Sequence, residues 1–167
     1  MLNSTVRSSG IKILCDDTKP VFVHGAYNLG PVYEVKLSSE AIHPGEGLDW
    51  GTGAGGEDTV GLMAANSVVA CGIAEVDFGM ITDCSVDYAS GDDIPVIYFH
   101  WMPGALLRNI VCVDTTAAVR PGTQLSTNST VAGAFDDDAG ACDPLRAAVY
   151  NASAGAFDIV AWIHTNW

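Results

Sequence analysis

The stretch SGDDIPVIYFHWMPGALLRNIVCV, residues 90–113, decides the fold. It opens with a turn at Ser-Gly-Asp-Asp, continues through the apolar, β-rich residues 94–101, turns again at Pro103-Gly104 and enters a second apolar run at 105–113. Proline presets φ at the first central position of a turn and glycine accepts a positive φ at the second, so the pair reverses the chain. The stretch therefore predicts short strands separated by tight turns.

The same Pro-Gly turn signal recurs on both sides of that stretch, because Pro44-Gly45 and Pro121-Gly122 each precede a short apolar run. Further β-rich runs occupy residues 11–14, 21–24, 32–37, 46–50, 59–63, 68–76, 130–135, 145–150 and 157–164. In the run 32–37, Glu34 and Lys36 share one face of the predicted strand. Only 61–70 and 143–150 show a modest helix signal. We predict a mainly β protein, a compact β-barrel with little helix.

Length and composition indicate one folded domain. The chain has 167 residues, of which 49% are hydrophobic and 16% charged, enough for a full core. Glycine and proline are spread evenly, so we expect a flexible polar arm at residues 1–10 and a single β-rich domain at 11–167. No apolar run reaches the roughly 18 residues of a membrane helix. Residues 1–10 also lack the apolar segment of a secretory signal, so we expect no membrane partner and assembly inside the cell.

The charge balance is strongly acidic, with 20 Asp and Glu against 7 Lys and Arg and a net charge of -13. Such a chain repels a phosphate backbone, and its bases are scattered, so we expect no nucleic-acid partner. The excess of aspartate and the scarcity of lysine also fit a protein from a strongly saline cytoplasm, where salt screens self-repulsion. An ordinary acidic protein is the equal alternative.

Cysteine usage favours buried thiols. The five cysteines are odd in number and form no C-x-x-C pair, so neither a zinc site nor a disulfide framework is indicated, although one disulfide stays open. They are Cys15, Cys71, Cys84, Cys112 and Cys142.

No motif for catalysis or cofactor binding stands out. The G-x-G-x-x-G match at residues 51–56 is followed by Glu57 and Asp58 instead of a helix, which favours a hairpin loop over a dinucleotide site. Hydrolase signatures such as G-x-S-x-G and H-E-x-x-H are missing. The four histidines lie one to a strand or turn, at His24, His43, His100 and His164. We expect His100 and His164, each beside a tryptophan at a strand end, to be hydrogen-bonded structural residues, and a convergent pair of histidines in the fold is the alternative. We therefore predict no enzyme activity, no cofactor and no catalytic, cofactor-binding or metal residue.

Two surface features leave alternatives open. Asp136, Asp137 and Asp138, with Asp143 nearby, have the oxygen ligands that Mg²⁺ or Ca²⁺ prefers, but the cluster lacks the spacing of an EF-hand loop. A solvated acidic loop is the favoured interpretation. N-x-S/T sequons occur at Asn3, Asn128 and Asn151, and chance explains most of them.

The order of short motifs from Ile42 to Trp167 resembles that of the head-decoration proteins of tailed viruses. The motifs are I-x-P-G at 42–45, A-x-G-I-A-E at 70–75, Y-x-x-G-D at 88–92, P-G-A-L-L at 103–107, R-P-G-T-Q-L at 120–125 and D-I-V-A-W-I at 158–163. The resemblance implies a small β-tulip barrel that clamps the outside of a capsid, usually as a trimer, with its leading arm laid along shell subunits. The implied partners are the major capsid protein and two further copies of the chain, and the implied location is the outer surface of the virion, after assembly in the host cytoplasm.

On this interpretation the protein stabilises the shell against genome pressure. Residues 1–10 would then add main-chain hydrogen bonds to a partner's sheet edge, or else form a disordered terminus. Trp50, Trp101 and Trp167 are candidate interface anchors, with a core position favoured for each. The alternatives are a turret, spike or receptor-binding module of the virion and, less favoured, a trimeric all-β nucleotide hydrolase.

Overall fold

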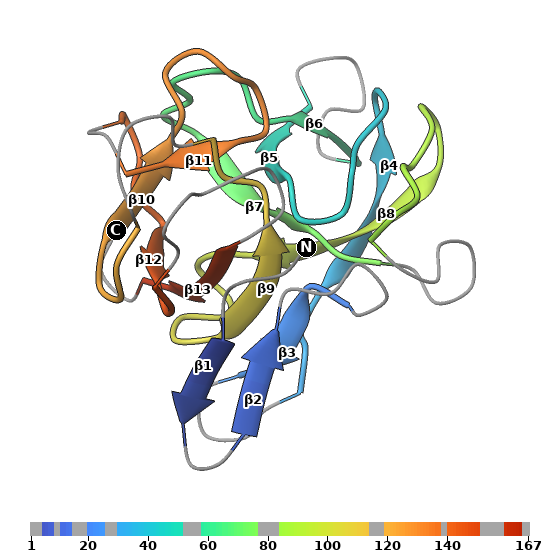
Figure 1. Ribbon diagram of the computed structural model, residues 1–167. Helices are drawn as coiled ribbons and strands as arrows, with labels where there is room; N and C mark the ends of the chain where they lie inside the picture. The colour runs from blue at the N-terminus through green and yellow to red at the C-terminus, as the bar shows by residue number, and fades with distance from the viewer. Residues whose placement is uncertain are drawn as a thin grey trace.

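Every regular element in the described part of the chain is a β-strand (Figure 1). The computed structural model describes residues 5–8, 11–14, 20–25, 30–51, 58–76, 84–113, 119–137, 140–150 and 159–164. The strands are β1 Thr5–Ser8, β2 Ile11–Leu14, β3 Phe22–His24, β4 Glu34–Ser38, β5 Gly47–Trp50, β6 Thr59–Leu62, β7 Ala70–Ala74, β8 Asp93–Tyr98, β9 Leu106–Ile110, β10 Gln124–Thr127, β11 Phe135–Asp136, β12 Leu145–Ala147 and β13 Ile159–Ile163. The predicted mainly β fold is confirmed.

Five of these strands close into a barrel in the order β4-β6-β5-β7-β8. β4 and β6 run parallel, whereas the other neighbouring pairs in the barrel are antiparallel. Closure pairs every strand on both sides and leaves no free edge for aggregation. The predicted β-barrel is therefore present.

A second, six-stranded sheet has the order β11-β10-β12-β13-β9-β3 and lies beside the barrel (Figure 1). One hydrophobic core runs through both parts, and the rings of Phe99 and Phe135 meet within it at 6.3 Å in an edge-to-face arrangement. The backbone joins them too, because the amide of Gly47 in β5 donates to the carbonyl of Gly133 at 2.8 Å. The barrel and the six-stranded sheet thus share their interior.

The β1–β2 hairpin lies at the bottom of the view in Figure 1 and pairs Thr5 with Leu14 and Ser8 with Ile11. Part of the expected N-terminal arm is therefore strand β1. The rest of the arm, residues 1–4, 9 and 10, lies outside the described residues.

All four predicted turns are present, and the glycine of each has a positive φ between 78° and 94°. These are Gly45, Gly91, Gly104 and Gly122. At Gly45 the turn also packs tightly, since a Cβ there would lie 2.1 Å from the carbonyl oxygen of Asn109 in β9. This turn holds the barrel against the six-stranded sheet, because its amide donates to Ala74 of β7 and its carbonyl accepts from Val111, just after β9.

Both weak helix predictions are wrong. The segment 61–70 begins inside β6 and ends at the first residue of β7, and the segment 143–150 contains β12. Sheet pairing with β5 and β13 overrides the helix propensity of the alanines in these segments. The strand predicted at 130–135 is mostly turn, and only Phe135 belongs to β11.

Candidate functional site

Strand β4 places its polar residues toward the barrel interior and its apolar residues outward. Glu34 and Lys36 form an ion pair at 3.2 Å, and the Lys36 side chain is only 10% exposed. The hydroxyl of Tyr98 in β8 donates to Glu34 at 3.1 Å. Because residues alternate across a strand, placing Glu34 and Lys36 on the Tyr98 side of β4 puts Val35 and Leu37 on the outer surface.

An exposed apolar face extends along β4 and the two residues before it, and it is made of Val32, Tyr33, Val35 and Leu37. These side chains are 48%, 49%, 50% and 44% exposed, respectively. Isolated apolar residues are ordinary on a protein surface, but a contiguous group marks an interaction site. We refer to these four residues as the apolar face.

A groove of about 210 Å³ continues from the apolar face toward β3. It is lined by Pro20, Phe22, Pro31, Tyr33, Val35, Glu75, Val76 and Pro95. Tyr33 and Val35 belong to both the groove and the apolar face, so the two form one continuous surface. The lining is mainly apolar, and its one carboxyl side chain is that of Glu75.

The Glu75 side chain is 4% exposed and holds one wall of the groove in place. Its Oε1 accepts from the amides of Val21 and Val76, each at 2.7 Å, and its Oε2 accepts from Phe22 at 2.6 Å. Burial raises the pKa of Glu75, while the three amides and the nearby Arg108 partly offset this rise. The carboxyl group therefore acts as a clamp on the segment that enters β3.

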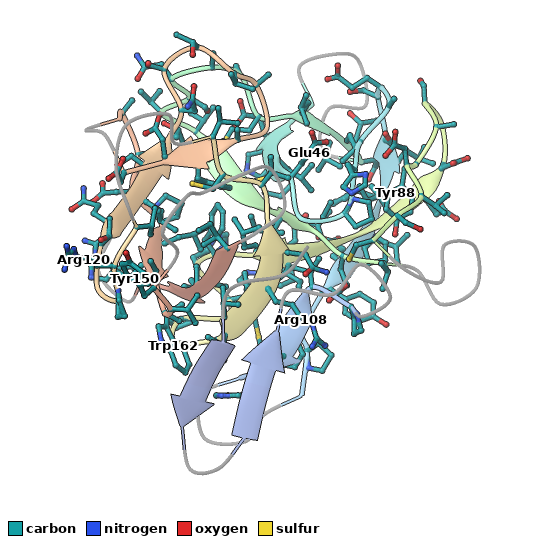
Figure 2. All side chains as sticks on the ribbon, in the orientation of Figure 1. Glu46, Tyr88, Arg108, Arg120, Tyr150 and Trp162 are labelled. Atoms are coloured by element: carbon teal, nitrogen blue, oxygen red, sulfur yellow. The ribbon has the colours of Figure 1, made fainter. Side chains whose placement is uncertain are left out.

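Arg108 fixes the same segment from the other side, and Figure 2 shows it next to β3. Its Nε donates to the carbonyl of Pro20 at 2.7 Å, and its amide donates to the carbonyl of Val21 at 2.8 Å. The side chains of Glu75 and Arg108 thus both form hydrogen bonds to the backbone of this segment. The arrangement provides a preformed apolar recess.

The acidic cluster at residues 136–138, expected to form a solvated loop, departs from this expectation at Asp136. Asp136 is 7% exposed, and its Oδ2 accepts from the Asn128 amide at 2.6 Å, so the prediction of a solvated position is wrong for this residue. Asp138 lies outside the described residues. In the described part of the chain, no group of three or more His, Cys, Asp or Glu side chains is placed to hold a metal ion.

Asn128 is a buried structural residue. Its Nδ2 also donates to Val113, and its Oδ1 accepts from the amides of Thr130 and Val131 at 2.8 Å each. The folded chain therefore hides this sequon from modification, whereas Asn3 and Asn151 lie outside the described residues.

The histidines are dispersed over the molecule. His43 Nδ1 lies 2.5 Å from Asp87, His24 contacts Trp162 edge-on at 5.4 Å, and His100 is exposed near Tyr98. His164 Nδ1 is buried without a hydrogen-bond partner among the described residues, so the hydrogen bond expected there is missing at this atom.

The remaining predicted positions divide between core and surface. The four described cysteines, Cys71, Cys84, Cys112 and Cys142, are buried, as predicted. Trp50 and Trp101 are 41% and 46% exposed, so the core positions favoured for them are wrong. Trp167 and the glycine-rich residues 52–57 lie outside the described residues.

Sequence reasoning did not identify the apolar face or the Glu75 clamp. The alternation in 32–37 was visible, but its outward direction depends on a partner 64 residues away, Tyr98. For Glu75, the only available signal was a lone acid inside an apolar run.

Comparison of the sequence with models of known protein families and with curated proteins gives no match. Across the described ranges, no helix has the length and apolar content needed to cross a lipid bilayer.

Proposed function

We propose that the protein is a structural virion component that binds the outer surface of a capsid and stabilises the shell. The partners are the major capsid protein and two further copies of this chain. The three copies form a trimer, and the host is a halophilic archaeon. The chain assembles onto the shell in the host cytoplasm and catalyses no reaction.

The observation that carries this proposal is the apolar face with its adjoining groove. Four large apolar side chains stand about half exposed on β4 and the two residues before it, whereas the polar side chains of β4 pair with one another on its other side. A protein partner that covered them would gain roughly 1 kcal/mol for the remaining half of each side chain. The resemblance of the motif order to that of head-decoration proteins supports the shell as that partner.

The proposed mechanism is thermodynamic. A protein that binds only the mature shell stabilises that shell by mass action against the outward pressure of the genome. In a closed trimer, three apolar faces act together, and each bound face raises the effective concentration of the other two. Individually weak contacts therefore give a tight assembly.

The experiment compares shell binding of two surface variants. Val35→Asp places an unpaired carboxylate in the proposed interface, which removes about 1 kcal/mol of burial and adds at least about 2 kcal/mol of desolvation. A loss of about 3 kcal/mol corresponds to binding roughly a hundredfold weaker. Val131→Asp is the control, because Val131 is 40% exposed on the turn after β10, outside the apolar face.

Both variants are mixed in high salt with capsids of the source virus stripped of this protein, and the bound fraction is measured by cosedimentation. We expect Val131→Asp to bind like the parent and Val35→Asp to remain in the supernatant. Equal binding of the two variants would refute the apolar face as the contact. Cryo-electron microscopy of the particle then separates a capsid-stabilising position from a turret or spike.

A further inference from the structure

A cluster of exposed aromatic rings lies at one end of the barrel, where β5 and β8 end. Trp50 stacks on Tyr98 with ring centroids 5.1 Å apart and an interplanar angle of 23°. Trp101 contacts the same Tyr98 ring edge-on at 4.5 Å. Tyr98 is fully buried, whereas the two tryptophans are 41% and 46% exposed. We call Trp50, Tyr98 and Trp101 the aromatic ledge.

Polar groups of fixed orientation border the aromatic ledge. The Glu34 side chain is 44% exposed, and its carboxylate already accepts from the Tyr98 hydroxyl and pairs with Lys36. Two carboxylate oxygens offer about four acceptor positions, so Glu34 retains capacity for further donors. His100 is exposed beside Trp101, with ring centroids 6.0 Å apart.

We propose that the aromatic ledge is a binding site for a neutral sugar, which lays the C–H face of a pyranose ring on the exposed indole of Trp101. Trp50 borders the sugar without serving as its platform, because its ring stacks on Tyr98 and Lys36 Nζ lies over it at 5.7 Å from the centroid. The sugar hydroxyls donate to Glu34 and exchange hydrogen bonds with His100. Because the tryptophans are held by the buried Tyr98, binding costs little ordering of side chains.

The polar groups beside the rings favour a sugar over an apolar protein surface at this site. The Glu34 carboxylate is partly exposed and the Lys36 ammonium lies 5.7 Å from the Trp50 ring centroid, so a ligand rich in hydroxyl groups matches them. The apolar face on the opposite side of β4 has exposed apolar side chains and no such ion pair, which suits protein contact better. The two faces of one strand thus serve different ligands.

The Glu34 carboxylate restricts the class of sugar. At contact distance it repels the carboxylate of a sialylated glycan or the sulfate of a sulfated one, even where salt screens the net charge of -13. The ligand is therefore a neutral glycan, such as those built from glucose, mannose or galactose.

The test uses saturation-transfer difference NMR on the full chain in high salt with cellotriose, mannotriose, lactose and 3′-sialyllactose. We expect at least one neutral glycan to bind at about 10 mM ligand, with the strongest transfer to the protons of one ring face. Trp101→Ala should weaken binding about fivefold or more, and Trp101→Phe should restore part of it.

The control variant is Trp162→Ala, because Trp162 is also partly exposed but lies on β13, away from β4 in Figure 2. It should bind the glycan like the parent, and melting curves should show that each variant is folded. The absence of transfer to every neutral glycan, or preferential binding of 3′-sialyllactose, would overturn the proposal.

This inference stands apart from the proposed capsid role, and the two can fail separately. Val35→Asp should bind glycan normally, and Trp101→Ala should still bind capsids. If Trp101→Ala instead lost capsid binding and the parent bound no glycan, the aromatic ledge would be a protein contact and the sugar site would be refuted.

Discussion

Replacing Glu75 with alanine removes the acceptor for three backbone amides at the entrance of β3. The amides of Val21, Phe22 and Val76 lie 2.6–2.7 Å from the carboxylate oxygens. Each buried amide left without an acceptor costs about 1–3 kcal/mol. Water that enters through the adjoining groove recovers part of this, so we expect a net loss of about 3 kcal/mol in the free energy of unfolding.

For a domain of this length, 3 kcal/mol corresponds to a fall in Tm of roughly 6–12 °C. The free energy is measured by urea denaturation, and hydrogen exchange at Val21 and Phe22 gives a local readout. Glu40→Ala is the matched control: Glu40 is exposed, and within the described ranges its carboxylate accepts one hydrogen bond, from the Leu62 amide at 3.0 Å. The Glu40→Ala substitution removes the same charge, and we expect it to lower the free energy of unfolding by less than about 0.5 kcal/mol.

The effect of Glu75 also depends on pH. Burial raises its pKa above the ordinary 4.5, so between 4.5 and the folded-state pKa the unfolded chain has released the proton while the folded chain retains it. The stabilisation by Glu75 is therefore complete below pH 4.5 and decreases as pH rises through the folded-state pKa. The difference in unfolding free energy between the parent and Glu75→Ala should shrink in the same direction.

The clamp would be refuted if Glu75→Ala and Glu40→Ala lowered the free energy of unfolding by amounts within about 0.5 kcal/mol of each other, and if hydrogen exchange at Val21 and Phe22 were unchanged. A difference between parent and variant that grew with pH would refute the direction of the pKa shift.

Three further predictions concern the turns, the buried amide network and the charge. Gly45→Ala should lower the free energy of unfolding by more than about 2 kcal/mol, because the new Cβ would lie 2.1 Å from the Asn109 carbonyl oxygen. Gly91→Ala has a similar φ but open space around it, so it should lower that free energy by only about 1 kcal/mol. Urea denaturation measures both values. Asn128→Ala should cost about 2–4 kcal/mol by thermal melting, because it leaves the buried Asp136 without its amide donor, and mass spectrometry of the parent should find no glycan on Asn128. Transfer from about 1 M salt to dilute buffer should lower the Tm, because the net charge of -13 is then no longer screened, and an unchanged Tm would contradict the halophilic hypothesis.

The positions of strands and turns were largely predictable from the sequence. Pro44-Gly45 and Pro103-Gly104 encode turns through their own backbone preferences, and Ile11–Leu14 has the predicted strand bounds. Such features depend on residues adjacent in the chain, which interact in the same way in every fold. The helix predictions for 61–70 and 143–150 failed because pairing with other strands, and not the preferences of adjacent residues, fixed the backbone there.

The candidate surfaces were much less predictable, because both depend on contacts between residues far apart in the chain. Trp50 and Trp101 are brought to one ring, that of Tyr98, only when the barrel closes. Glu75 meets the amides of Val21 and Phe22 across more than 50 residues. No local pattern encodes either contact.

The sequence by itself determined that the chain forms short strands with tight turns, and that Glu34 and Lys36 share one side of β4. Only the tertiary structure decided which side points inward. A period of two separates the faces of a strand but does not orient them. Here the Tyr98 hydroxyl and the Glu34–Lys36 pair satisfy one another on one side of β4, and this leaves Val35 and Leu37 in water on the other.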